Sequence, residues 1–303
     1  MEKSDFIWFD GKFVDWDSAQ INVMTHTLHY GTGVFEGIRA RNTEKGVSIF
    51  RLNDHVDRLF ASADSYNLKI PYTKEVIFEA IKDVVSKNKL QSAYIRPLVF
   101  FGEGEMGLLP KDVPVRVSIA AWYWGAYLGD EAVNQGVNVC ISRWRRISPT
   151  SFIPLAKGVG GYMNSTLAKI DAVENGYDDA IMLGDDGTVA EGSGQNIFLM
   201  KDQKVITPEL TCCLNGITRR SVMKIASDLG YEVLERQITR DELYTADELF
   251  FSGTAVEITP IKSVDKIDIG TGSRGEITEK IQSTYLDAVR GKANQYSDWL
   301  SKV

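Results

Sequence analysis

Two short stretches of this chain, EGSGQNIF at residues 191–198 and LNGITR at residues 214–219, decide how its fold is to be read. Lys157 precedes Glu191 by 34 residues. A lysine amine can condense with an aldehyde, and a carboxylate can keep the nitrogen of a pyridine ring protonated so that the ring accepts electrons. Lys157 and Glu191 therefore have complementary chemistry on one heterocycle.

Lys157 lies in a predicted loop, because the segment AKGVGGY at residues 156–162 has three glycines in four positions. Glycine lets a backbone turn tightly and approach a ligand closely. A lone loop lysine would be read as a solvated charge, as we read Lys169 on the following predicted helix. A lysine in such a glycine-rich loop is a better nucleophile candidate than a lysine on a helix face. Tyr162 could contact the same ligand or cap an edge of the core.

A helix start, a turn of small residues and a helical arginine are three further features of the chain. Residues 216–218 open a predicted helix, whose first amides and the Thr218 hydroxyl can face a phosphate. The small residues 252–255 follow an apolar strand and form a second turn. Arg58 lies on the polar side of another predicted helix. Read alone, Thr218 is equally a routine helix cap, and Arg58 is a solvated charge.

The composition is that of an ordinary globular protein, with 303 residues, 44% of them hydrophobic and 25% charged. The net charge of −7 argues against a nucleic-acid partner, since phosphate backbones select basic surfaces. The local basic cluster of Arg143, Arg145 and Arg146 reads as solvated side chains at a strand end.

The chain also shows no sign of export or membrane insertion. Cys140, Cys212 and Cys213 are odd in number and lack metal or redox spacing, so a disulfide framework is not expected. The apolar run 119–128 is far shorter than the roughly 20 residues of a membrane-spanning helix. No secretory signal is visible at residues 1–5. We expect a soluble, cytoplasmic protein.

Helices and strands alternate without a steady βαβ rhythm, which favours the α+β class. A hairpin is predicted around Asp10 and Gly11, and a helix capped by Asn53 follows the next strand pair. The other expected helices span about residues 73–87, 164–175, 217–229 and 276–289, and the other expected strands span 35–40, 47–52, 94–101, 115–124, 137–141, 180–183, 197–200, 232–235 and 249–251. We predict an N-terminal domain at 1–124, an interdomain loop at 125–133 and a C-terminal domain at 134–303.

The order of Lys157, the 191–198 stretch and the 214–219 stretch resembles the signature of the class IV pyridoxal-phosphate aminotransferases. The resemblance implies the two-domain α+β architecture of fold type IV, with a sandwich-like N-terminal α/β domain and a pseudo-barrel C-terminal α/β domain that binds pyridoxal 5′-phosphate. It makes Lys157 the catalytic residue that binds the cofactor aldehyde, with Glu191 on the pyridine nitrogen. The cofactor-binding set that it implies is Arg58, Lys157, Tyr162, Glu191, Leu214, Gly216, Ile217, Thr218, Gly253 and Thr254.

Within class IV, the N-terminal half resembles the branched-chain amino-acid aminotransferases. The resemblance rests on HYGTGVFEGIR at 29–39, on YIRP at 94–97 and on WGAYLG at 124–129, and it extends over nearly the full chain. It implies ping-pong transfer of the amino group of leucine, isoleucine or valine to 2-oxoglutarate, with Arg39 and Arg96 available to the second carboxylate. The implied substrate-binding set is Tyr30, Phe35, Gly37, Arg39, Tyr94, Arg96, Trp124, Tyr127, Thr254 and Ala255.

Three other hypotheses compete with this one. A D-amino-acid or (R)-amine transaminase is the nearest, although Tyr94 and Arg96 argue against it. A metal-binding protein using His26, His29 and His55 lacks a tight ligand set, so no metal is expected. A scaffold without activity would not be expected to keep the whole set of reactive residues.

The resemblance also implies a homodimer or a larger homo-oligomer whose pockets borrow residues across the interface. Leu108 and its neighbours in the glycine-rich segment 102–110 are candidates for that contribution. One local departure from the family pattern is that Val159 and Gly161 stand where many relatives have Gly and Asn.

Overall fold

The computed structural model describes residues 2–125 and 134–303. Contacts between Cα atoms divide the chain into two compact units. The first comprises residues 1–124, 156–161 and 287–303, and the second comprises residues 125–155 and 162–286. The predicted interdomain loop at 125–133 lies, from residue 126 on, outside the described residues. The predicted functional domains, 1–124 and 134–303, stay a prediction.

The first unit is built on one sheet. Among the described residues this sheet has eight strands, in the order β17-β5-β4-β6-β7-β1-β2, with β3 paired to β6. Its elements are β1 (Phe6–Phe9), β2 (Lys12–Asp15), η1 (Trp16–Ser18), α1 (His26–Tyr30), β3 (Gly33–Phe35), β4 (Ile38–Thr43), β5 (Gly46–Phe50), α2 (Leu52–Ser65), α3 (Lys74–Lys87), β6 (Ala93–Phe101), β7 (Val115–Trp122), η2 (Val159–Gly161), η3 (Asn294–Trp299) and β17 (Leu300–Lys302).

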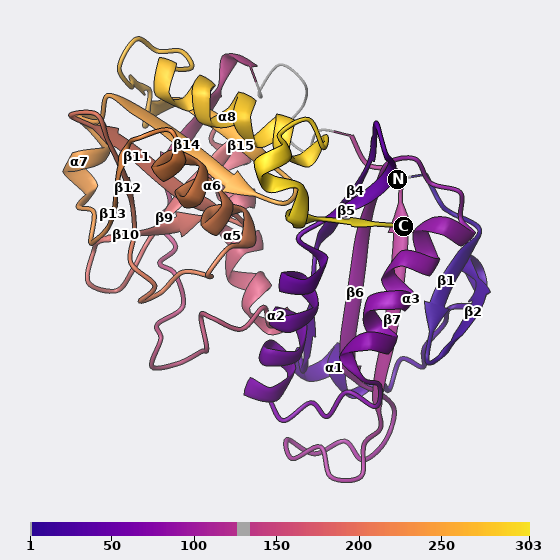
Figure 1. The fold of residues 1–303 in the computed structure, drawn as a ribbon. Helices are drawn as coiled ribbons and strands as arrows, with labels where there is room; N and C mark the ends of the chain where they lie inside the picture. Colours follow the sequence, from indigo (N-terminus) through magenta and orange to yellow (C-terminus); the bar gives the residue numbers. More distant parts are fainter. Residues whose placement is uncertain (1, 126–133) are drawn as a thin grey trace. The chain divides into compact units, whose positions relative to one another are not determined.

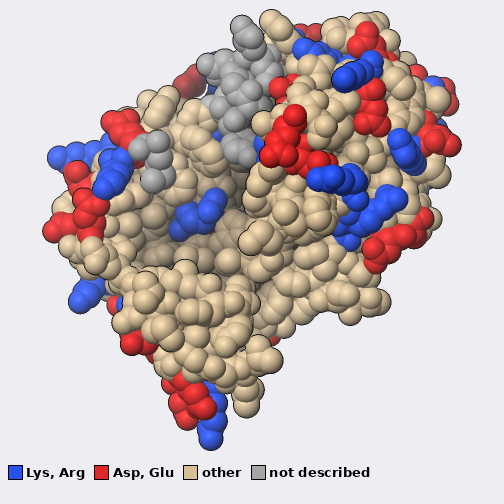
Figure 2. Space-filling model, turned by 180° about the vertical axis from the view of Figure 1, so that it is seen from behind, with Lys and Arg blue, Asp and Glu red and all other residues tan. Residues whose placement is uncertain are grey.

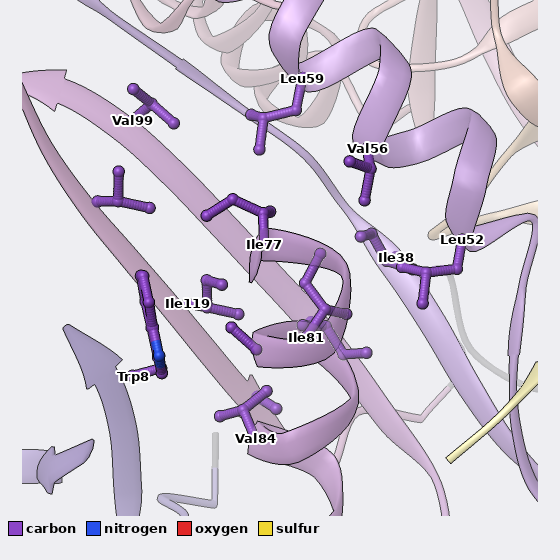
Figure 3. Close-up of a cluster of buried hydrophobic side chains, with 14 of the residues drawn as sticks. Trp8, Ile38, Leu52, Val56, Leu59, Ile77, Ile81, Val84, Val99 and Ile119 are labelled. Atoms are coloured by element: carbon purple, nitrogen blue, oxygen red, sulfur yellow. The ribbon is translucent and has the colours of Figure 1, made fainter. Parts of the chain in front are cut away.

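Helices α2 and α3 cover one face of this sheet (Figure 1). Successive residues of a strand point to opposite faces, so alternate positions of β6 and β7 supply the covered core. Burying one large apolar side chain in this core contributes roughly 1.5–3 kcal/mol to stability. Figure 3 shows the helix side chains directed at the sheet side chains; those labelled are Leu52, Val56, Leu59, Ile77, Ile81, Val84, Ile38, Val99, Ile119 and Trp8.

The second unit is built on another sheet. Among the described residues it has nine strands, in the order β10-β9-β8-β15-β14-β11-β12-β13, with β16 paired to β15. Its elements are β8 (Val137–Ile141), α5 (Tyr162–Glu174), β9 (Asp179–Leu183), β10 (Val189–Gly192), β11 (Asn196–Lys201), β12 (Lys204–Thr207), α6 (Ile217–Asp228), β13 (Glu232–Glu235), α7 (Arg240–Tyr244), β14 (Glu248–Gly253), β15 (Glu257–Val264), β16 (Ile267–Asp268) and α8 (Glu276–Val289), whose last residues belong to the first unit.

The helix ends follow the local sequence, with one exception. The Thr73 hydroxyl accepts a hydrogen bond from the Val76 amide at the start of α3, and Gly230 ends α6 with φ +88°. Asn53 is not the cap of α2, as the sequence suggested. The helix begins at Leu52, and its cap position is Arg51, two residues before Asn53, with a φ of +52°.

The mixture of helices and sheets in two units agrees with the predicted α+β class. Acidic and basic side chains alternate over the face drawn in Figure 2, without a large field of one sign. Within the described ranges, no helix is both long and apolar enough to span a bilayer.

Candidate active site

The predicted site residues divide between the two units, and Lys157 belongs to the first. Its main-chain carbonyl accepts a hydrogen bond from the Phe35 amide at 3.1 Å, and its amide donates to the Ser62 hydroxyl at 3.0 Å. The Nζ atom lies 4.9 Å from the centroid of the Phe35 ring. Two segments distant in sequence thus fix the main chain from which the half-buried amine extends.

The glycines around Lys157 serve packing within the first unit. A Cβ atom on Gly31 would lie 2.9 Å from the Cα atom of Gly160, and Gly31 has a φ of +65°. The Gly160 amide also donates to the Gly31 carbonyl at 3.2 Å. Glycine at both positions is what lets the lysine loop lie against the turn after α1.

Lys169, the alternative nucleophile, is committed to an ion pair in the second unit. Its Nζ lies 2.9 Å from Oδ2 of Asp179, a residue with no exposed surface, and 2.5 Å from the Asp178 carbonyl. A buried carboxylate needs a cation, because an unpaired charge is costly to bury. The expectation that Lys169 is merely a solvent-facing charge is therefore wrong.

Arg58 lies on α2 and binds a buried carboxylate that the sequence did not single out. Its Nε and Nη2 atoms donate to the two oxygens of Glu36 at 2.6 and 2.9 Å. His55, one turn earlier on α2, contacts the same carboxylate through Nδ1 at 2.7 Å. The phosphate contact expected of Arg58 stays a prediction.

The charge state of this cluster follows from burial and pairing. Burial alone would raise the pKa of Glu36, but Arg58 and His55 outweigh it and hold that pKa far below its usual value. Burial lowers the pKa of His55, despite the carboxylate beside it. Glu36 is therefore ionised and His55 neutral, with Nδ1–H as the donor, because an ionised carboxylate can only accept.

The histidines do not form the metal site considered above. His55 contacts Glu36, and the ring nitrogens of His26 contact the Thr32 hydroxyl and the Gly107 carbonyl, each at 2.8 Å. Within residues 2–125 and 134–303, no group of three or more His, Cys, Asp and Glu side chains could hold a metal ion.

Arginine and aromatic side chains share the face of the first sheet opposite to the one that α2 and α3 cover. Arg39 is opposite Tyr94 on neighbouring strands, and Tyr94 is opposite Trp122, so the three project to one side. The Arg96 guanidinium carbon lies 4.7 Å from the Phe35 ring centroid, 5.5 Å from that of Tyr94 and 6.0 Å from that of Trp122. Arg96 Nε is buried, yet the described residues offer it no hydrogen-bond acceptor.

Only some of the other predicted substrate-binding residues lie close to Tyr94 in the first unit. Gly37 lets Tyr94 approach, because a Cβ atom there would lie 2.0 Å from the Tyr94 hydroxyl oxygen. Arg39 Nη1 donates to the Trp124 carbonyl at 2.9 Å, and Trp124 packs edge-on against Tyr94. Tyr30 is exposed at the end of α1. Tyr127, also in the set, lies outside the described residues.

In the second unit, the buried Glu191 carboxylate is surrounded by donors. Arg146 Nε lies 2.7 Å from Oε1, and the Leu214 amide and Asn196 Nδ2 lie 3.3 and 3.4 Å from Oε2. These contacts stabilise an ionised carboxylate. The interpretation of Arg146 as a solvated strand-end charge is wrong, because its side chain is only 16% exposed and paired with Glu191.

Asn196 connects Glu191 to the start of α6. Its Nδ2 also donates to the Leu214 carbonyl at 2.8 Å, and its Oδ1 would lie 2.1 Å from a Cβ atom on Gly216. Gly216 is the N-cap of α6 and has no side-chain cap. Within the part of the chain that the structure describes, the first amides of this 12-residue helix, at Ile217 and Thr218, are therefore available to an anion or to water.

The second predicted phosphate turn also lies in this unit. Gly253 ends β14, and Thr254 and Ala255 follow it as half-buried residues. Beside them, the Ser252 hydroxyl and Gln195 Nε2 are buried and have no hydrogen-bond partner among the described residues. Such groups are rare in folded proteins and indicate a ligand or an ordered water. The last predicted cofactor residue, Tyr162, is the half-buried first residue of α5.

The family model for "Amino-transferase class IV" matches residues 33–264. A branched-chain-amino-acid aminotransferase of Pseudomonas aeruginosa is 50% identical over 302 residues, which cover 100% of this chain and 98% of that protein.

Two solved structures give the same result. The branched-chain amino acid aminotransferase of Escherichia coli has a TM-score of 0.97 at 43% identity, and the match covers 99% of each chain. The branched-chain amino acid aminotransferase of Thermobaculum terrenum, solved in its form with pyridoxal 5′-phosphate, has a TM-score of 0.92 at 34% identity, again over 99% of each chain. The fold expected from the sequence is confirmed.

Proposed function

Because the chain belongs to the branched-chain-amino-acid aminotransferase family, within the class IV aminotransferases, we propose that it transfers the amino group of L-leucine, L-isoleucine or L-valine to 2-oxoglutarate. The products are the branched 2-oxo acid and L-glutamate. The observation that carries this proposal is the buried Nε of Arg96, which lies among three aromatic rings and has no hydrogen-bond acceptor among the residues that the structure describes.

The two substrates make different demands on this one surface. The apolar branch of leucine needs rings such as Phe35 and Trp122. The distal carboxylate of 2-oxoglutarate needs a donor in the same place, and a guanidinium matches a planar carboxylate. Arg96 supplies that donor at little cost when leucine is bound, because its plane already lies over aromatic faces.

The cofactor is pyridoxal 5′-phosphate, and the residues present fit it. Lys157 would bind its aldehyde, Glu191 its ring nitrogen and Tyr162 its phenolic oxygen. The phosphate would lie on the Gly216–Thr218 amides, the Gly253–Thr254 turn and Arg58. Three observations on the described part of the chain favour this assignment: a buried carboxylate surrounded by donors, a helix start without a side-chain cap, and a buried Ser252 hydroxyl without a hydrogen-bond partner.

When bound, pyridoxal 5′-phosphate supplies an electron sink that makes the substrate α-hydrogen acidic. Lys157 Nζ moves that proton, first as general base and then as general acid. Arg146 keeps Glu191 ionised, so that Glu191 can hold a proton on the ring nitrogen. Arg96 orients each substrate in turn. The amino acid comes first and the 2-oxo acid second, because the amino group has to be taken from the donor before the acceptor can receive it, and this is the ping-pong order.

A donor panel tests the proposed reaction. We expect the purified protein to aminate 2-oxoglutarate with L-leucine, L-isoleucine and L-valine, and to use D-alanine and (R)-amines at least about a hundredfold less well. Activity with D-alanine above that with L-leucine would reject the proposal in favour of the D-amino-acid transaminase.

We also infer that the chain works as a homodimer or a larger homo-oligomer in the cytoplasm. Several large apolar side chains of the first unit are exposed, as expected of a surface that another copy covers; they are Val23, Leu28, Leu108 and Leu109, at 76%, 59%, 85% and 75%. Light scattering during gel filtration should give at least twice the 33.8 kDa of one chain. A single-chain mass at working concentration would contradict this.

A further inference from the structure

We propose that Glu36 is a positioning residue for cofactor binding, whose buried carboxylate holds the Arg58 guanidinium in the orientation that binds the cofactor phosphate. This inference rests on the phosphate role proposed above for Arg58. Glu36 itself is assigned no contact with cofactor or substrate.

The geometry of the cluster fixes the plane of the guanidinium. Glu36 accepts from Arg58 Nε and Nη2 at 2.6 and 2.9 Å, one contact on each carboxylate oxygen. Such a two-point contact sets both the position and the plane of the arginine, which one contact could not do. His55 Nδ1, at 2.7 Å, prevents the carboxylate from rotating away.

The burial of Glu36 indicates a specific role. The residue has no exposed surface, and the Arg58 side chain is only 13% exposed. Buried ion pairs add little net stability, because desolvation offsets the attraction, and apolar residues of similar size would often do as well. A pair that restricts a cation to one orientation has a use that an apolar replacement would lack.

The same cluster also relates Arg58 to Lys157. His55, Arg58 and Ser62 are spaced three and four residues apart, so they form one stripe along α2. Ser62 accepts from the Lys157 amide at 3.0 Å, at the far end of this stripe.

The residue before Glu36 completes the connection, because the Phe35 amide donates to the Lys157 carbonyl at 3.1 Å. The amine that takes the aldehyde and the cation that takes the phosphate are therefore set by one strand end and one helix of the first unit. Fixing them before the cofactor arrives lowers the entropy that binding must lose.

The test compares pyridoxal 5′-phosphate with pyridoxal, which lacks the phosphate. Full-length apo protein is titrated with each compound. The ratio of the dissociation constant of pyridoxal to that of pyridoxal 5′-phosphate reports the phosphate contribution alone. We expect Glu36→Gln to weaken pyridoxal 5′-phosphate by about tenfold to a hundredfold, the loss of one charge-assisted contact, and to leave pyridoxal within about twofold. Equal weakening of both compounds would overturn the inference, since it would indicate a merely structural role.

Two further variants separate the possible failures. Arg58→Ala should strongly lower the same ratio. The double variant with Glu36→Gln should have the same ratio as Arg58→Ala alone. If Arg58→Ala leaves the ratio unchanged, the phosphate role of Arg58 is wrong, and this inference falls with it. If Arg58→Ala collapses the ratio and Glu36→Gln does not, only the inference about Glu36 is overturned.

The chain offers a matched control on the same helix. The Asp54 carboxylate accepts hydrogen bonds from Nε and Nη2 of Arg51 at 2.5 and 2.9 Å, so it forms the same kind of ion pair at the start of α2. Asp54→Asn should leave the ratio unchanged. If Glu36→Gln does not fold, Glu36→Asp keeps the charge but retracts it by one methylene. This variant should reduce the ratio at least about threefold, and an unchanged ratio would overturn the inference.

Discussion

Arg96 is the residue that distinguishes the two substrates. Its guanidinium lies over aromatic rings that suit a branched side chain, and its buried Nε suits a carboxylate. Replacing the charged side chain by an apolar one should therefore separate the two half-reactions.

We predict that Arg96→Leu lowers kcat/KM for 2-oxoglutarate by about tenfold to a hundredfold, which is the loss of a charge-assisted hydrogen bond, and lowers that for L-leucine by much less. Half-reaction kinetics measure the two values separately. Arg116, which stacks on Phe9 and pairs with Asp10 in the same sheet, is the control, and Arg116→Leu should show no such selectivity. Equal losses for both substrates would contradict the assignment.

Glu191 and Arg146 act as a pair at the other end of the proposed cofactor. We predict that Glu191→Gln retains bound cofactor and loses roughly a hundredfold in kcat, because a neutral amide cannot hold the ring nitrogen protonated. Absorbance of the purified variant measures cofactor content, and steady-state assays measure the rate. An unchanged kcat would count against the electron-sink role.

At this scale the sequence predicts residue types with reactive roles but misses the residues that support them. Lys157 and Glu191 were predicted because their order and their separation of 34 residues resemble the family signature. Glu36 and Arg146 were not, because a charged residue beside a strand reads the same whether it is solvated or buried. Only the fold shows that Glu36 contacts His55 and Arg58 on α2. It also shows that Arg146 forms an ion pair with Glu191.

Among the elements, α6 carries the proposed phosphate site and is anchored by one buried arginine. Arg219 is 2% exposed, and it donates to the Thr207 hydroxyl, the Pro208 carbonyl and Glu235 at 3.3, 2.8 and 2.7 Å. These contacts attach the first turn of α6 to β12 and β13.

We predict that Arg219→Met destabilises the protein by about 2 kcal/mol, since it leaves buried acceptors without a donor while Glu235 can still reach water. The midpoint of urea unfolding measures the change. Lys224 pairs with Asp228 on the exposed side of the same helix, so Lys224→Met should change stability by at most about 0.5 kcal/mol. Similar effects of the two substitutions would contradict the anchoring role.

Local sequence patterns predict most elements but not long-range pairing. The Thr73 cap and the apolar spacing of residues 74–87 suffice for α3, and Asp10 and Gly11 suffice for the first hairpin. Nothing local indicates that β17, the last strand, pairs with β5. The start of α2 was misplaced because Arg51 adopts a left-handed backbone, which is uncommon for arginine.

At the scale of the whole molecule, the reactivity of the three cysteine thiols measures how accessible the interior is to solvent. All three are buried free thiols. Burial raises the pKa of Cys140 to about 11 and that of Cys213 to about 12, and it also raises the pKa of Cys212.

We therefore predict that the native protein reacts with a disulfide reagent at less than one thiol over minutes at pH 7, and that raising the pH to 9 adds little. An exposed cysteine, with a pKa near 8.5, would react strongly over that range, because the thiolate is the reacting form. Unfolding in guanidinium should release all three thiols. Rapid labelling of the vicinal pair at pH 7 would show that it is accessible.

The identity of the amine that binds the cofactor aldehyde decides the proposed chemistry. Reduction of the purified protein with borohydride, followed by peptide mapping, fixes and locates the covalent bond. We predict one phosphopyridoxyl group per chain, on Lys157, and none on Lys169, whose amine is engaged by Asp179. A phosphopyridoxyl group on any other residue, or none at all, would contradict the proposed function.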